Sequence, residues 1–296
     1  MDLSDGIDAW AARTTALDLT GIDWDAVPRH PLPAEARRVL RYVQDVEAHT
    51  LAYLRALLAT RVVDDPDIAT FLACWFYEET FHGRALARFL EAAGDAPLGR
   101  SRLRPPLLVR ITDALTRVVA RAWPDFVAVH MTWGAINEAT TLVAYERLAA
   151  RGGHPVLREL VARIRRQEAR HFGFYRAEAA RRLAAPRTAR VARLLVDRFW
   201  APVGSGVEPD AEVRFLAGYL FAGADGLAAA RRVDETIRRL PGFGDVALLE
   251  RWLVRAGVQP ASRTAAPAAA ARGAYQRSRV LGASGAAAAA GLRANV

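Results

Sequence analysis

The 296-residue sequence contains no lysine, so all 41 of its strongly basic side chains are arginines. This absence excludes enzymes that form a Schiff base through a lysine, and it excludes the phosphate-binding P-loop, which needs one. The single cysteine, Cys74, excludes an internal disulfide framework, a cysteine-rich zinc site and a Cys-ligated iron–sulfur cluster within one chain. We expect Cys74 itself to be a small, buried apolar residue.

Long uncharged runs are also missing. No stretch stays uncharged for the ~18 residues that a membrane helix needs, and the N-terminal segment MDLSDGIDAW is acidic, without the apolar core of a signal peptide. We therefore expect no membrane insertion, and a cytoplasmic location follows by default. The hydrophobic content of 52% is enough for a sizeable buried core.

The formal net charge of +9 is concentrated in two segments. Residues 151–198 contain thirteen arginines and four acidic residues, and residues 260–296 contain five arginines and no acid. The remainder of the chain is therefore acidic on balance. We expect no nucleic-acid partner. The arginines of the first segment, among them Arg163, Arg166, Arg181 and Arg182, form either a docking surface for an acidic partner or a solvated helix face.

Proline and glycine fall where helices begin and end, and neither strand-like alternation nor a Gly-rich phosphate loop is found. The pattern predicts an all-α protein: a mostly irregular arm over 1–32, a helical domain over 33–258 and a disordered Ala/Gly/Arg-rich tail over 259–296. The four long helices expected to carry the site run over 33–60, 66–93, 124–151 and 155–184; a shorter helix is expected over 107–122, and further helical patterns follow over 187–200, 209–239 and 244–257. Because residues 94–123 form a lengthy crossover, we expect a four-helix bundle with one crossover connection and additional C-terminal helices.

Two short motifs on the second and fourth long helices pair a glutamate with a histidine three residues later: Glu79 with His82, and Glu168 with His171. Residues at this spacing share a helix face, so both can bind one metal ion. The other two long helices each offer one acid that interrupts an apolar stripe, Glu47 and Glu138. A lone buried carboxylate costs several kcal/mol unless it is paired or binds a metal, so four that converge favour cations.

Four carboxylates and two imidazoles suit two divalent ions of iron or manganese, as in di-iron proteins of the ferritin-like bundle. The competing interpretation is that each acid is a solvated helix residue and that both motifs arose by chance in helices rich in arginine and glutamate. Glu78 either orients a metal-bound histidine or is exposed. The other histidines lack a matching partner and are interpreted as surface, cap or packing residues: His30, His49, His130 and His154.

The segments WFYEETFHGRAL, INEATT, QEARHFGFY and VEAHTLAY, the last with Glu47 and Tyr53, resemble the four metal-binding helices of the soluble acyl-[acyl-carrier-protein] desaturases. The resemblance covers residues 35–185 and, more loosely, 209–242. It implies a homodimeric enzyme with two iron ions that takes electrons from a ferredoxin, activates O2 and desaturates an acyl chain on acyl carrier protein. It also implies that Thr141, one turn after Glu138, donates a hydrogen bond or relays protons beside the oxygen site.

The chain departs from that pattern at Gln167, where plant-type members have an aspartate of a Trp-His-Asp electron relay; by the same resemblance Trp24 is the candidate relay tryptophan. Gly134, Ala135 and Met131, with Trp75, Phe76 and Phe172, form either an apolar channel for the acyl chain or ordinary core. Three alternatives stay open. The first is a di-iron hydroxylase of another carrier-bound or free substrate, the second a ferroxidase or iron-storage protein, and the third a metal-free helical interaction protein.

Overall fold

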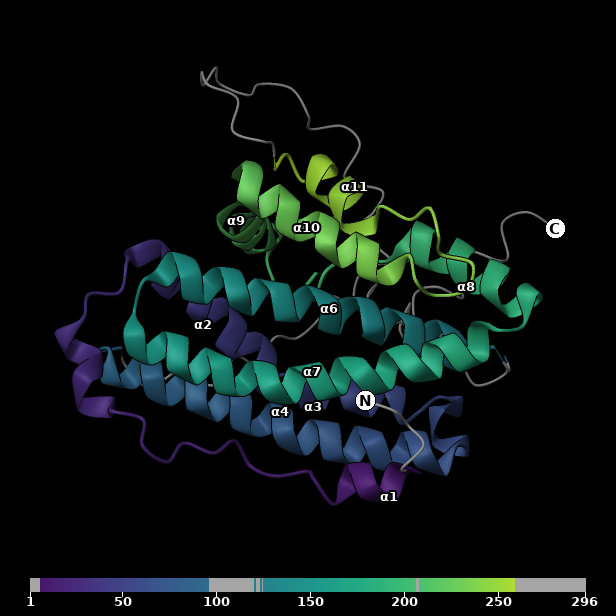
Figure 1. The fold of residues 1–296 in the computed structure, drawn as a ribbon, viewed down its shortest axis with the longest axis horizontal. Helices are drawn as coiled ribbons and strands as arrows, with labels where there is room; N and C mark the ends of the chain where they lie inside the picture. Colours follow the sequence, from purple (N-terminus) through teal and green to yellow (C-terminus); the bar gives the residue numbers. More distant parts are fainter. Residues whose placement is uncertain (1–5, 96–119, 121–122, 124, 206–207, 259–296) are drawn as a thin grey trace.

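The computed structural model of the chain is an all-α helical bundle, as predicted (Figure 1), and it describes residues 6–95, 120, 123, 125–205 and 208–258. The four long helical segments of the prediction are α2 with α3, α4, α6 and α7. The elements in chain order are α1 (Gly6–Ala11), η2 (Trp24–Arg29), α2 (Ala34–Ala48), α3 (Thr50–Leu57), η3 (Arg61–Asp64), α4 (Pro66–Ala92), α6 (Phe126–Gly152), α7 (Pro155–Leu183), α8 (Pro186–Phe199), α9 (Asp210–Phe221), α10 (Gly223–Ile237) and α11 (Leu248–Arg255).

The ends of the two motif-bearing helices follow from their capping residues. The Asp65 side chain accepts hydrogen bonds from the first free N–H groups of α4, and a proline occupies the first turn. The ring of His154 caps α7 in the same way by accepting from Leu157 N. Gly153, with φ +64°, ends α6 in the left-handed conformation that glycine adopts without strain.

Two predicted helices are each broken into two. The helix expected over 33–60 stops at His49, whose ψ of 1° does not continue the α-helix and whose N–H bonds to Asp45 O and Val46 O. The helix expected over 209–239 breaks at Gly223, which has φ +79°. The predicted helix over 107–122 and the predicted tail over 259–296 lie outside the described residues, apart from Ala120.

The bundle consists of two helix pairs, because α2 packs along α4 and α6 packs along α7. Figure 1 shows α9, α10 and α11 lying over α6, with α4 and α1 toward the opposite side. The N-terminal arm is irregular only in part: it contains α1 and η2, which contact α4, and it buries Trp10 and Val27 in the core. Cys74 is half-buried at the edge of that core. None of the described helices has both the length and the apolar composition needed to cross a membrane.

A close approach of α6 and α7 depends on Gly134. A Cβ at this position would meet the ring of Tyr175 well inside contact distance, and Tyr175 is 1% exposed. That ring is enclosed by the rings of Phe71, Trp75 and His130, so it has no free space to move into. The tight pairing of the two helices therefore places Glu138 near the motif of α7.

We expect Gly134→Ala to lower the free energy of unfolding by about 1–3 kcal/mol, because overpacking forces the buried ring or the backbone to shift. The matched control is Gly218→Ala in α9, where an added Cβ meets nothing within 4 Å. There the higher helix propensity of alanine is expected to leave stability unchanged or to raise it by up to about 1 kcal/mol. Chemical denaturation of both variants measures the difference, and equal stabilities would contradict the packing described.

Candidate metal centre

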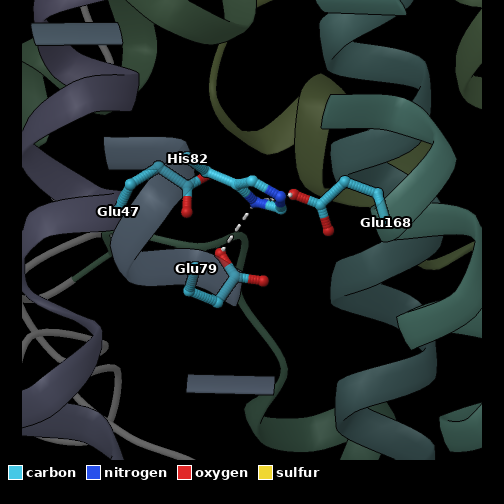
Figure 2. A group of neighbouring side chains, drawn as sticks. All are labelled: Glu47, Glu79, His82 and Glu168. Carbon is cyan, nitrogen blue, oxygen red and sulfur yellow. Dashed lines mark ion pairs between the residues drawn. The ribbon is translucent and has the colours of Figure 1, made fainter. Parts of the chain in front are cut away.

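The six residues predicted as metal ligands converge from four helices, and all six side chains are buried. They form two overlapping groups. The His82 group consists of Glu47, Glu79, His82 and Glu168, and the His171 group consists of Glu79, Glu138, Glu168 and His171. In each group, one possible ligand atom per residue lies within 4.8 Å of all the others. Figure 2 shows the His82 group, with Glu168 facing His82 from a different helix.

Glu79 and Glu168 belong to both groups, and each directs one carboxylate oxygen toward each histidine. From Glu79, Oε2 lies 3.6 Å from His82 Nδ1 and Oε1 lies 3.1 Å from His171 Nδ1. From Glu168, Oε1 lies 3.2 Å from His82 Nδ1 and Oε2 lies 3.2 Å from His171 Nδ1. Carboxylates placed in this way can bridge two cations, one beside each histidine.

The remaining carboxylate of each group receives one hydrogen bond from a buried aromatic side chain. Tyr145 donates to Glu47 Oε1 at 2.7 Å, and Trp75 Nε1 donates to Glu138 Oε1 at 3.1 Å. Each donor fixes the orientation of a carboxylate without using its other oxygen. The sequence reasoning missed Tyr145, although its position seven residues after Glu138 on the same face of α6 signals that it points toward the site.

The residue that precedes each motif holds the histidine of the other motif. Glu78 Oε2 lies 2.8 Å from His171 Nε2, and Gln167 Oε1 lies 2.8 Å from His82 Nε2. Glu78 is fully buried against His171, so the interpretation of an exposed residue is wrong, and its contact is the one expected of a residue that orients this histidine. Because an acceptor at Nε2 fixes a proton there, Nδ1 of each histidine is the ring nitrogen that can bind a cation once its own proton is lost.

Gln167 was predicted only as a gap in an electron relay, yet it is part of the support around the metal centre. Its Nε2 donates to the backbone oxygen of Thr15 at 2.9 Å, and the backbone N–H of Thr15 donates to Glu78 Oε1 at 3.2 Å. Thr15 of the N-terminal arm thus contacts both Glu78 and Gln167, which are the outer partners of the two histidines, meaning the residues that face their Nε2 atoms. The arm could not be assigned this role from sequence, because the contacts join residues far apart in the chain.

Burial and the charges within the cluster shift the pKa values of its members. Burial, followed by the charge of Glu79, raises the pKa of Glu47 well above its usual value, and burial with the charge of Glu168 does the same to the pKa of Glu138. Burial alone would lower the pKa of His82, but the adjacent carboxylates outweigh it and raise that pKa to about 10. The metal-free cluster therefore retains protons where a bound cation would replace them.

The donor atoms fit a metal. His82 Nδ1 and Glu168 Oε1 are buried and lie 3.2 Å apart, yet neither makes a hydrogen bond. Buried polar atoms are nearly always hydrogen-bonded, so an unpartnered pair that faces the centre of the cluster is suited to a ligand that accepts lone pairs. Carboxylate and imidazole donors without thiolate suit divalent cations that prefer oxygen and nitrogen ligands.

Metal affinity is expected to rise with pH. Binding requires ionised Glu47 and Glu138 and an unprotonated His82 Nδ1, whereas the raised pKa values of these groups keep protons in the metal-free protein. Each cation therefore displaces protons, and the association constant increases as the pH rises from about 6 to about 8. Titration with Mn²⁺ at several pH values measures this slope, and an affinity independent of pH would contradict the assignment.

An apolar cavity of about 80 Å³ adjoins the His82 group between α2, α6 and the C-terminal helices. Glu47 and Tyr145 border it, and so does half-buried Thr141, the residue predicted to assist near the oxygen site. Its other lining residues are Tyr42, Val43, Val46, Thr140, Ala144, Leu148, Pro202, Val203, Val213, Leu216, Ala217, Leu220, Phe221, Leu249 and Trp252. The residues predicted as a channel do not line it, since Gly134, Ala135 and Met131 are packed in the core.

Within the N-terminal arm, the tryptophan that approaches the centre is Trp10, whose ring centroid lies 6.3 Å from that of His171. The sequence had suggested Trp24, but the ring of this half-buried residue lies under the guanidinium of Arg88 at 4.1 Å. Trp24 thus makes a packing contact at the edge of α4. Sequence spacing could not distinguish the two tryptophans, because the path of the arm decides which one reaches the motifs.

Three of the four arginines considered for docking make contacts within the molecule. Arg163 donates to two backbone oxygens of the N-terminal arm, and Arg181 and Arg182 both contact Glu178. Arg166 is exposed. Much of the positive charge of α7 therefore stabilises the fold, and these side chains give little support to a surface that binds an acidic partner.

Comparison of the chain with protein-family models, with curated proteins and with solved structures found no match. The chemistry of the centre therefore rests on its own residues: two groups of buried carboxylates and imidazoles that can hold metal ions and that share Glu79 and Glu168.

Proposed function

We propose that the chain is an O2-dependent non-haem oxidoreductase with two iron ions, which introduces a double bond into an acyl chain carried on acyl carrier protein. The observation that carries this proposal is the pair of carboxylates, Glu79 and Glu168, each with one oxygen near each histidine. A single ion would need only one of the two groups. The duplicated set supports two ions that act together.

Iron ions bound at the two positions would supply O2 activation and a two-electron oxidation of the substrate. The protein supports this chemistry by holding Glu47 and Glu138 in place through Tyr145 and Trp75. Burial of the ligands excludes bulk water from the centre, which protects a strong oxidant from side reactions. Thr141 borders the same cavity as Glu47, and its hydroxyl group can donate a hydrogen bond or transfer a proton there.

The cavity supports an apolar substrate. Apart from Glu47 and the hydroxyl groups of its tyrosines and threonines, its lining consists of aliphatic and aromatic side chains. A few carbon atoms of a hydrocarbon chain can occupy such a space next to the metal centre without leaving polar groups unpaired. An organic substrate is therefore favoured over iron storage or a ferroxidase activity.

The carrier protein, the ferredoxin and a homodimeric assembly enter the proposal through the resemblance to the desaturases. In the desaturation, the chain loses two adjacent hydrogens, and O2 takes up four electrons and four protons to form two waters. Two of these electrons and two protons come from the substrate, two electrons come from the ferredoxin, and two protons come from solvent. Hydroxylation of the same chain uses the same reactants but leaves one oxygen atom on the product.

The test is to incubate the iron-loaded protein with ferredoxin, its reductase, O2 and a panel of acyl-carrier-protein thioesters, and to measure product masses. Loss of two hydrogens is the expected result. A product heavier by one oxygen atom would show that the reaction is a hydroxylation and not a desaturation. No turnover of any thioester, in a protein with a reducible pair of irons, would contradict a carrier-bound acyl substrate.

A further inference from the structure

We infer that the two metal positions are unequal, and that the position beside His171 binds a divalent cation more tightly than the position beside His82. The inference rests on the metal centre of the proposed function and adds an order of filling to it. Its basis is a single difference in charge within an otherwise duplicated arrangement.

The direct donors to the two positions are equivalent in kind. Each position has one histidine, one carboxylate of its own and the shared pair Glu79 and Glu168. The individual carboxylates, Glu47 and Glu138, each receive one hydrogen bond from a buried aromatic donor. Neither position therefore has an advantage in the number or the charge of its ligands.

The outer partners of the two histidines differ. His171 Nε2 faces a carboxylate oxygen of Glu78, whereas His82 Nε2 faces the amide oxygen of Gln167, both at 2.8 Å. A carboxylate acceptor makes an imidazole a stronger donor to its metal than an amide acceptor does. The cation beside His171 is therefore held by the more basic ring.

Arg170 reduces this difference without removing it. Its guanidinium lies 3.2 Å from Glu78 Oε1, the oxygen that also accepts the backbone N–H of Thr15. The other oxygen of Glu78, Oε2, faces His171, so a negatively charged oxygen still lies next to the imidazole ring. The compensating positive charge lies on the far side of the carboxylate and is partly exposed to solvent.

The backbone of Thr15 shows why the two outer partners are different residues. Its N–H needs an acceptor and meets Glu78, while its C=O needs a donor and meets the Nε2 of Gln167. A glutamate at position 167 would place a carboxylate oxygen against the carbonyl, leaving both without a donor. The inequality of the two metal positions is thus fixed by the path of the N-terminal arm.

The first test locates a single cation. Crystals of the full chain are prepared with one equivalent of Mn²⁺, and the anomalous signal gives the occupancy of each position. Repulsion between two cations lowers the fraction of molecules that hold both ions, but it affects the two positions equally. A difference in occupancy between the positions therefore reports a difference in their affinities. We expect the position beside His171 to be about tenfold or more the better occupied, the size of effect typical of outer partners. Equal occupancy, or preference for His82, would overturn the inference.

A matched pair of truncations tests the same point in solution. Glu47→Ala removes a ligand from the position beside His82, and Glu138→Ala removes its counterpart beside His171. Mn²⁺ titration, followed by the spin-resonance signal of the free ion, is expected to give a dissociation constant about tenfold or more lower for Glu47→Ala. Equal constants, or the reverse order, would overturn the inference.

Adding Glu78→Gln to the Glu47→Ala variant gives both histidines an amide partner at Nε2. This double variant is expected to bind its remaining ion at least about tenfold more weakly than Glu47→Ala does. No change in that ion's affinity would overturn the inference. If the wild-type protein binds two Mn²⁺ ions and these comparisons fail, only the order of filling is wrong. If the wild-type protein binds none, the metal centre of the proposed function fails as well.

Discussion

Replacing Glu168 by alanine is expected to remove both metal ions, whereas replacing Glu47 is expected to remove or weaken one. Glu168 has one oxygen near each histidine, so its loss takes a ligand from both positions at once. Glu47 belongs to the His82 group alone. Metal analysis after anaerobic reconstitution with Fe²⁺ measures the difference as iron bound per chain.

The two variants also separate a metal centre from a structural cluster. Without metal, Glu168→Ala is expected to keep its helical fold by circular dichroism but at lower stability, because Glu168 is paired with His82 and His171, whose contacts lower its pKa despite burial. Added Fe²⁺ should stabilise the wild-type protein by about 4 kcal/mol for each ion at a thousandfold excess over its dissociation constant, and should not stabilise the variant. Unchanged iron content in Glu168→Ala would refute the ligand assignment.

Filling the cavity with Ala144→Phe is expected to reduce turnover of the acyl substrate tenfold or more while leaving the iron content unchanged. Ala144 lines the cavity from α6, and a phenyl ring there would occupy much of a space of about 80 Å³. Displacing a chain by about 1 Å from its reactive position is enough to cost a hundredfold in rate. Product formation and iron content are measured on the same preparations.

The matched control for this substitution is Ala150→Phe, which places the same ring on the same helix at an exposed position. It is expected to retain wild-type turnover, since surface substitutions usually change little. Full activity in Ala144→Phe would show that the substrate binds elsewhere. Loss of iron from this variant would show that the cavity supports the metal centre and does not serve as a binding site.

Helix boundaries and metal ligands were the features most accessible to sequence reasoning. The starts of α4 and α7 follow from capping residues and prolines within a few positions of each other, which are local signals. The ligands are recognisable because each carboxylate interrupts an apolar face, and helical spacing fixes which residues share that face. The convergence predicted for Glu47, Glu79, Glu138 and Glu168 is present in the fold.

The partners of those ligands depend on tertiary contacts that local patterns do not encode. Gln167 and Glu78 lie next to the motifs in sequence, but each holds the histidine of the other helix. Thr15 reaches them because the arm passes beside both α4 and α7 at this point. The break at His49 was missed for a similar reason, since nothing in the helical pattern of residues 33–60 marks a stop.

The most direct measurement is Mössbauer spectroscopy of the protein reconstituted with two equivalents of ⁵⁷Fe²⁺ and then exposed to O2. If Glu79 and Glu168 bridge two ions, the two ferric irons are expected to couple to a diamagnetic ground state. In an applied field, the spectrum of such a pair shows only the splitting caused by that field. Magnetically split spectra of isolated high-spin ferric ions, or binding of one iron or none per chain, would contradict a shared centre at these carboxylates.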